Sequence, residues 1–91
     1  MPGIKVGDII GVFCEVQPGP FSDERVLTIE TVDGPISGFV RQENLKNTEK
    51  GWVVRAEVRN ISNDTIEVRI EGSFFTTNGV ASVPKRLALA A

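Results

Sequence analysis

The chain has 91 residues, with no histidine, no tyrosine, one cysteine and one tryptophan. Without histidine there is no imidazole to activate a serine or cysteine nucleophile or to ligate zinc. One cysteine can form no internal disulfide and cannot complete a cysteine-rich metal site. We therefore expect no catalytic residue, no metal ion and no cofactor, and we exclude the disulfide-rich secreted scaffolds.

Long apolar runs and a large charge excess are also missing. Ten Lys and Arg residues face 12 Asp and Glu residues, and the net charge of −2 argues against a dominant phosphate-binding surface. No segment approaches the roughly 18 consecutive apolar residues of a membrane span. The first residues lack the basic-then-apolar order of a signal peptide. We expect a cytoplasmic protein with no membrane partner.

Residue choice points to β-structure. The sequence holds 12 Val and 8 Ile against 4 Leu, and β-branched side chains suit a pleated sheet better than a helix. Glycine and proline lie mostly between the Val- and Ile-rich runs and divide the chain into short segments. The prediction is a single all-β domain over residues 1–91, a small antiparallel barrel of about six short strands. Residues 1–6 and 88–91 are expected to be loosely ordered.

Alternation of apolar and polar residues places the strands. We expect them at residues 9–17, 25–32, 36–41, 52–59 and 66–71, with a last hairpin joining 73–77 to 80–83. In that hairpin Asn78-Gly79 is typical of a type I′ turn, which needs positive φ at both central residues. The polar segment 42–50 is expected to hold a single helical turn.

Charges select one register for the hairpin of residues 52–71. Apolar residues must oppose apolar residues across an antiparallel pair, and two nearby registers satisfy that requirement. One of them places Glu57 against Glu67, which repels. The other pairs Arg59 with Glu67, Glu57 with Arg69 and Arg55 with Glu71, each pair contributing about 0.2–1 kcal/mol. We predict this second register, with a loop over 61–65.

A faint internal repeat suggests two similar halves. Ile29-Glu30 parallels Ile70-Glu71, and Gly7 to Ile10 parallels Gly51 to Val54. Asp33-Gly34 leading to Val40 and Leu45 also parallels Asn78-Gly79 leading to Val83 and Leu87. The repeat predicts two pseudo-symmetric three-stranded meanders, although any two Val- and Ile-rich halves would align to some degree.

One fragment resembles a known family. Gly38-Phe39-Val40-Arg41-Gln42-Glu43-Asn44-Leu45 resembles the closing strand of small Src-homology-type β-barrel modules, including bacterial ones. There a Gly-aromatic-Val-Pro run is followed by a short turn and an apolar residue, and Arg41 here takes the place of the proline. The resemblance implies a small binding barrel, often one for peptides in the polyproline conformation held in a tyrosine-rich groove.

Other polar groups have ordinary structural explanations. Cys14 lies between Val12 and Val16 on an apolar strand face, so a buried core thiol is expected rather than a nucleophile. Asp23, Glu24 and Glu30 could in principle bind a cation or act as acid and base. Their spacing matches no metal-binding loop, so we expect a solvated turn and an outward strand position.

The aromatic residues are more informative. If Val12 and Val16 face inward, Phe13 faces outward, and Phe39 leaves its strand on the side opposite Val40. Phe21 follows Pro20 in a loop. Such exposed aromatic side chains mark either a second small core, an interface with a partner or a second copy, or a surface that stacks on a ligand.

Two functions from different classes follow. The first is a non-catalytic protein-binding or assembly module that contacts a protein partner, or itself, through Phe13, Phe21, Phe39 and Arg41. The alternative is a single-stranded nucleic-acid-binding barrel of the oligonucleotide-binding type. Its bases would stack on Phe39 or Trp52, with the phosphates near Arg41, Arg55, Lys85 and Arg86. We favour the module because the predicted register already pairs Arg55 and Arg59 with glutamates.

Overall fold

A computed structural model describes residues 3–74 and 78–90, except for the side chain of Ala90. The described chain forms nine strands and two single-turn 3-10 helices, with no α-helix among these residues. In chain order they are β1 Ile9–Pro18, β2 Glu24–Thr31, β3 Gly34–Arg41, η1 Gln42–Asn44, β4 Leu45–Thr48, β5 Gly51–Ile61, β6 Thr65–Arg69, β7 Ser73–Phe74, β8 Val80–Pro84, η2 Lys85–Leu87 and β9 Ala88–Ala90. The predicted all-β class is confirmed.

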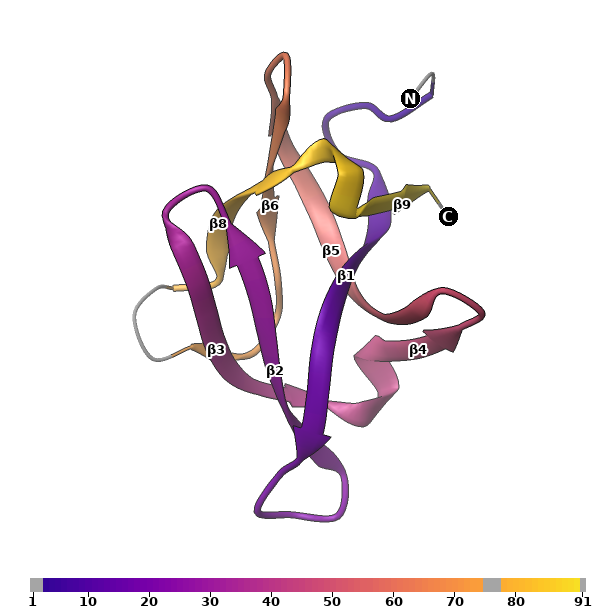
Figure 1. Ribbon diagram of the computed structural model, residues 1–91, viewed down its shortest axis with the longest axis vertical. Coiled ribbons are helices and arrows are strands. Elements are labelled where there is room, and N and C mark those ends of the chain that lie inside the picture. The colour runs from indigo at the N-terminus through magenta and orange to yellow at the C-terminus, as the bar shows by residue number, and fades with distance from the viewer. Residues whose placement is uncertain (1–2, 75–77, 91) are drawn as a thin grey trace.

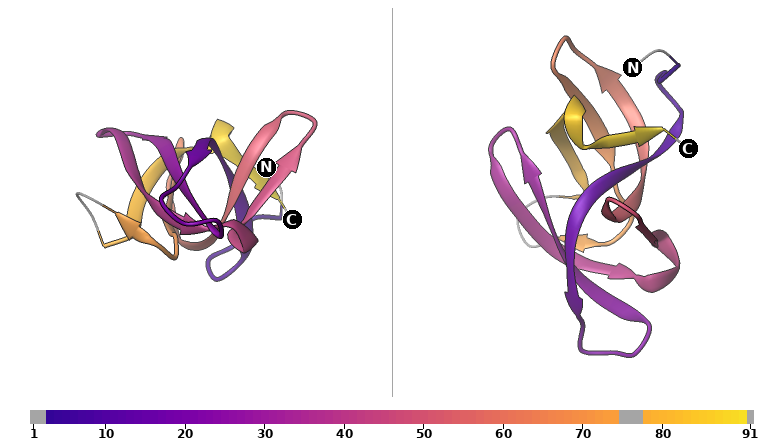
Figure 2. Two further views of the ribbon diagram at one scale, coloured as in Figure 1. Left: turned by 90° about the horizontal axis from the view of Figure 1, so that it is seen from below. Right: turned by 45° about the vertical axis from the view of Figure 1, so that its right-hand side comes forward.

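The strands form one curled antiparallel sheet with the shape of a half-barrel (Figures 1 and 2). Its order is β7-β3-β2-β1-β5-β6-β8, with β4 added to β5 and β9 added to β1. Curling brings β8 beside the far end of β2, where the backbone N–H of Val32 donates to the carbonyl oxygen of Ser82 (2.9 Å). The long strands β1 and β5 run through the middle of the sheet.

The nine strands exceed the six expected because three of them are very short. β4 lies in the polar segment 42–50, where its backbone pairs with β5 although its side chains do not alternate. Residues 88–90, expected to be loose, form β9 and pair with β1, and Ala88 is only 6% exposed. Backbone pairing with an existing strand, rather than apolar alternation, creates these two strands.

The core comes from the inward face of nearly every strand. Its largest fully buried side chains are Leu27, Ile29, Ile66, Ile70, Val12, Val40, Val54, Val58, Val68 and Val83. Cys14 and Phe74 are partly buried and pack against this cluster. The core contains no buried charged or polar side chain among the described residues, so apolar burial is the main stabilising contribution.

The predicted register of β5 and β6 is correct at one end only. Glu57 lies opposite Arg69 as expected, and Glu57 does not face Glu67. A bulge after Val58 shifts the pairing, so Glu67 lies opposite Asn60 rather than Arg59. The bulge leaves Arg59 free to approach Glu57 on its own strand, with 3.8 Å between Nη1 and Oε1. The expected opposition of Arg55 and Glu71 also fails, because β6 ends at Arg69.

The last predicted hairpin, 73–77 with 80–83, is described only in part. β7 pairs with β3, and β8 pairs with β6. Gly79 has a φ of 93°, and its carbonyl oxygen accepts a hydrogen bond from the N–H of Ile70 (2.7 Å). Part of the predicted strand, residues 75–77, lies outside the described residues.

Pairing around β1 and β5 confirms that the two halves are pseudo-symmetric. Val12 and Val54 lie directly opposite each other. On its other side Val12 pairs with Ala88 of β9, and Val54 pairs with Leu45 of β4. The three-stranded unit β1, β2 and β3 therefore corresponds to β5, β6 and β8, and the approximate two-fold axis passes between the two valines.

The 3-10 turns obey the same symmetry. The N–H of Gln42, at the start of η1, donates to the carbonyl oxygen of Asp23 (2.8 Å), and the N–H of Lys85, at the start of η2, donates to that of Asp64 (2.9 Å). η1 is followed by β4, which pairs with β5, and η2 is followed by β9, which pairs with β1.

The predicted repeat is present in part: Ile29-Glu30 corresponds to Ile70-Glu71 and Val40 to Val83. The parallels of Gly7 to Ile10 with Gly51 to Val54 and of Asp33-Gly34 with Asn78-Gly79 are wrong, because Ile10 corresponds to Trp52 and Ser37 to Val80. Leu45 corresponds to Ala88 rather than to Leu87.

A substitution at Gly38 tests the close approach of β7 to β3. A Cβ there would lie 2.6 Å from the carbonyl oxygen of Ser73 and 2.9 Å from the Cα of Phe74. Gly→Ala normally stabilises a chain slightly by restricting its unfolded state. Here we expect Gly38→Ala to lower the free energy of unfolding in urea by about 1–3 kcal/mol.

The control is Val32→Ala, in a turn where the side chain is 52% exposed, and it should change stability by less than about 0.5 kcal/mol. An unchanged or increased stability of Gly38→Ala would show that β7 does not pack against β3 as described.

Candidate binding surfaces

Two equivalent surface depressions lie where paired strands separate. β1 pairs with β2 only from Glu15 onward, and before that point β9 takes the place of β2 beside β1. The depression at this separation, here called the β1–β2 fork, has a volume of about 240 Å³ and is mostly apolar. Its lining residues are Phe13, Cys14, Glu15, Thr28, Glu30 and Leu87.

The second depression, the β5–β6 fork, arises in the same way. β5 pairs with β6 from Glu57 onward, and before that point β4 lies beside β5. This fork has a volume of about 270 Å³ and is lined by Ile9, Asn44, Arg55, Ala56, Glu57, Arg69 and Glu71.

The pseudo-symmetry relates the two forks residue by residue. Each residue of the β1–β2 fork corresponds to one of the β5–β6 fork: Phe13 to Arg55, Cys14 to Ala56, Glu15 to Glu57, Thr28 to Arg69, Glu30 to Glu71 and Leu87 to Asn44. Both forks keep two glutamates at equivalent positions. The two arginines of the β5–β6 fork are replaced by an aromatic and a hydroxyl side chain in the β1–β2 fork.

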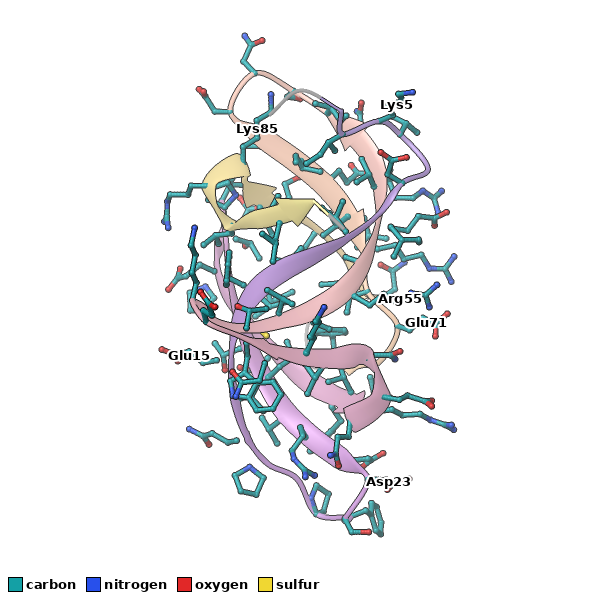
Figure 3. The ribbon with its side chains drawn as sticks, turned by 90° about the vertical axis from the view of Figure 1, so that its right-hand side faces the viewer. Lys5, Glu15, Asp23, Arg55, Glu71 and Lys85 are labelled. Atoms are coloured by element: carbon teal, nitrogen blue, oxygen red, sulfur yellow. The ribbon has the colours of Figure 1, made fainter. Side chains whose placement is uncertain are left out.

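The two forks therefore differ in charge. In the β5–β6 fork two arginines balance two glutamates, and Arg59 lies near Glu57 as well. In the β1–β2 fork Glu15 and Glu30 make no ion pair with any residue of 3–74 or 78–90. Figure 3 shows Arg55 and Glu71 on one side of the molecule and Glu15 on the opposite side.

A third depression, of about 420 Å³, contains two of the predicted site residues. Phe39 and Arg41 both line it, together with Glu24, Glu43 and Glu71. The guanidinium of Arg41 lies 3.8 Å from a carboxylate oxygen of Glu43. This surface is mostly polar, and its carboxylates outnumber its single arginine.

A fourth depression lies over the outer face of β4, β5, β1 and β9 and has a volume of about 310 Å³. Gly11 forms part of its lining, and a Cβ added there would meet the side chain of Val53 at 3.0 Å. Ile9, 41% exposed, and Leu89 extend the apolar surface. Glycine thus keeps the face concave near the two-fold axis.

The predicted partner-binding residues do not form one continuous patch. Phe39 and Arg41 share the polar depression, whereas Phe13 lies in the β1–β2 fork. Phe21 is 66% exposed in the turn between β1 and β2. Phe13 and Phe39 are partly buried rather than fully exposed.

The predicted nucleic-acid-binding residues are also dispersed. Trp52 is 37% exposed and lies opposite Cys14 on β1. Lys85 and Arg86 lie in η2. Arg41 immediately precedes η1, which is the equivalent turn in the other half of the sheet. Arg55 lies in the β5–β6 fork among glutamates.

Sequence reasoning missed Leu87, Glu15 and Thr28 as neighbours of Phe13. The repeat carries the signal that could have found them, because the parallel of Ile29-Glu30 with Ile70-Glu71 holds in the structure. The parallel of Gly7 to Ile10 with Gly51 to Val54 would instead set Phe13 against Glu57, so the match of Phe13 with Arg55 follows only from the pairing of Val12 with Val54. The splitting of the strand pairs, which creates the forks, has no signature in either half alone.

The described residues hold no group of three or more Asp, Glu, Cys or His side chains placed to bind a metal ion. Within the same residues no helix is long and apolar enough to cross a membrane. Burial raises the pKa of the Cys14 thiol from 9.0 to about 11, and the thiol donates a weak hydrogen bond to the carbonyl oxygen of Trp52 (3.8 Å).

Comparison with known proteins shows no relative. No protein-family model, curated protein or solved structure matches this chain significantly.

The raised pKa predicts an unreactive cysteine. At pH 8 the folded protein should react with iodoacetamide about a hundredfold more slowly than the urea-unfolded chain, because a thiol of pKa about 11 holds far less thiolate than one of pKa 9.0. The pH dependence of alkylation should have its midpoint near 11. A midpoint near 9 would show that Cys14 is solvated.

The same shift predicts a loss of stability in base. The unfolded chain releases the thiol proton first, so the contribution of Cys14 is fully present below pH 9 and is lost as the pH rises toward about 11. In Cys14→Ala this part of the stability-against-pH curve should flatten, as measured by urea unfolding between pH 8 and 11. An unaltered curve would contradict the assignment.

Proposed function

We propose that this chain is a non-catalytic protein-binding module that contacts its partner through the β1–β2 fork. The observation that carries the proposal is a mostly apolar surface depression lined by an aromatic residue that the sequence predicts to bind a partner. Aromatic anchors in concave apolar surfaces are typical of the energetically dominant part of protein interfaces.

The pseudo-symmetric fork provides the contrast. There the position of Phe13 is held by Arg55, and the equivalent of Leu87 is Asn44. The fold thus accommodates charged and polar side chains at both positions. Leu87 also packs against the core, whereas Phe13 is not part of that cluster, and a binding role accounts for an aromatic residue there.

The family resemblance agrees with this class of function. Gly38 to Leu45 forms a strand, a 3-10 turn and the start of a second strand, the sequence of elements expected from Src-homology-type modules. Val83 to Ala88 repeats the arrangement in the second half. We do not extend the proposal to polyproline ligands, because the chain has no tyrosine to form their groove.

The charges around the predicted nucleic-acid-binding residues disfavour the alternative function. Arg41 is close to Glu43, and the depression that holds Phe39 contains three glutamates. A phosphate backbone needs several uncompensated cations along one surface. A protein partner is therefore the better proposal.

The module hypothesis can be tested by selecting binders from a random peptide library displayed on phage. We expect enriched peptides whose affinity falls at least tenfold in Phe13→Ala, because truncating an interface anchor costs about 2 kcal/mol or more. Circular dichroism and thermal unfolding establish that the variant is folded.

Phe21→Ala is the matched control, since this equally large side chain is highly exposed and lies outside the fork. It should leave the affinity of the same peptides within twofold. Failure to enrich any peptide, or peptides that bind Phe13→Ala and the parent protein equally, would overturn the proposal.

Titration of a fluorescein-labelled oligothymidine tests the alternative. We expect no binding at micromolar protein in low salt, because the basic residues do not share one surface. Tight binding that weakens steeply as salt is added would instead indicate a nucleic-acid-binding protein, since such affinity depends on counterion release.

A further inference from the structure

We propose that the β1–β2 fork binds a basic side chain of the partner, with an arginine guanidinium over Phe13 and between Glu15 and Glu30. The inference rests on the proposed function and specifies the chemistry of the partner. The occupant is an arginine side chain of a protein partner.

The first step is the comparison of the two forks. Two glutamates occupy equivalent places in both, as Glu15 and Glu30 in one and Glu57 and Glu71 in the other. The β5–β6 fork supplies the opposite charge from within the chain, and Arg55 is the residue at the position of Phe13. The β1–β2 fork has glutamates at the same two positions, but no Lys or Arg is among its lining residues.

The second step concerns the carboxylates themselves. Both Glu15 and Glu30 are exposed, so water stabilises them in the free protein and their charge costs little. A partner that covers the fork would remove this water, and a covered carboxylate without an opposite charge is unfavourable. The electrostatically complementary occupant is therefore positively charged.

The third step concerns the apolar lining. Phe13 and Leu87 form the mostly apolar part of the depression, which a small hydrated cation would not use. An arginine has an apolar stem that can pack against leucine, and its guanidinium can lie over an aromatic face. Arginine is more weakly hydrated than lysine and stacks on rings, so it fits this combination better.

The test uses four fluorescein-labelled heptapeptides of the form Gly-Ala-Leu-X-Leu-Ala-Gly, where X is arginine, lysine, citrulline or glutamate. Fluorescence anisotropy measures their affinities. The arginine peptide should bind at least about tenfold more tightly than the uncharged citrulline peptide of the same shape, and the glutamate peptide should bind most weakly. The preference for arginine should decrease as salt is added.

Trp52 gives an independent measure, because it is the chain's one tryptophan, no tyrosine is present, and it lies opposite the fork residue Cys14. The intrinsic fluorescence of Trp52 should therefore change at the same concentrations of the arginine peptide that change the anisotropy.

Matched variants locate the site. The double variant Glu15→Gln/Glu30→Gln should weaken the arginine peptide about tenfold and leave the citrulline peptide unchanged. The same change in the symmetry-related fork, Glu57→Gln/Glu71→Gln, should leave both affinities within twofold.

Phe13→Arg places an arginine where the other fork already holds Arg55. This variant should fold, as thermal unfolding will show, and should supply the cation from within the chain. Binding of the arginine peptide should be lost.

The outcomes separate this inference from the proposed function. Equal binding of the arginine and citrulline peptides, or an arginine peptide unaffected by the Glu15→Gln/Glu30→Gln change, would overturn the basic-side-chain inference. So would the absence of binding of any of the four peptides up to about 1 mM. The protein-binding function would still stand if library-selected peptides depend on Phe13, and would fail if they do not.

Discussion

Antiparallel pairing of β1 with β5 is the interaction on which the rest of the structure depends. It sets Val12 directly against Val54 in the core, and every other described strand except β3, β7 and β8 pairs directly with one of these two. The pairing also places the two-fold axis of the fold. Because each central strand exceeds the length of its neighbours, it pairs with one strand over part of its length and with a different strand beyond. The forks are a direct consequence of this exchange of partners.

The two forks show how one backbone arrangement supports two surfaces of different chemistry. Where Arg55 and Arg69 balance the glutamates, the depression carries no net charge from these groups. Where Phe13 and Thr28 replace them, the same depression becomes mostly apolar and acidic. The difference in charge depends on two side chains, Phe13 and Thr28, and neither belongs to the core cluster, which is built mainly from the opposite face of the strands. The proposed function would therefore use mainly the face of these strands that is opposite to the core.

Local patterns predicted most of the strands because alternation and turn residues act over a few positions. The segment Ile9 to Gln17 alternates strongly and was found almost to its ends, whereas β4 and β9 carry no such pattern. The predicted register of β5 and β6 is correct for Glu57 and Arg69 but wrong beyond the bulge after Val58. A bulge adds one residue to one strand, and the alternation of charges does not indicate where that happens. Asn78-Gly79 predicts a two-residue turn, but no local pattern indicates that β7 pairs with β3 or that Gly79 accepts a hydrogen bond from Ile70.

The sequence by itself determined the all-β class, the apolar face of each long strand and the existence of two similar halves, since these depend on residue type and short periodicities. It also predicted that Phe13 lies on the outward face of its strand, opposite to the face of Val12. Only the tertiary structure decided what surrounds that residue. Glu15, Glu30 and Leu87 come from β1, β2 and η2, and they meet only because β9 displaces β2 from the side of β1. Long-range strand pairing makes that choice, and no local pattern encodes it.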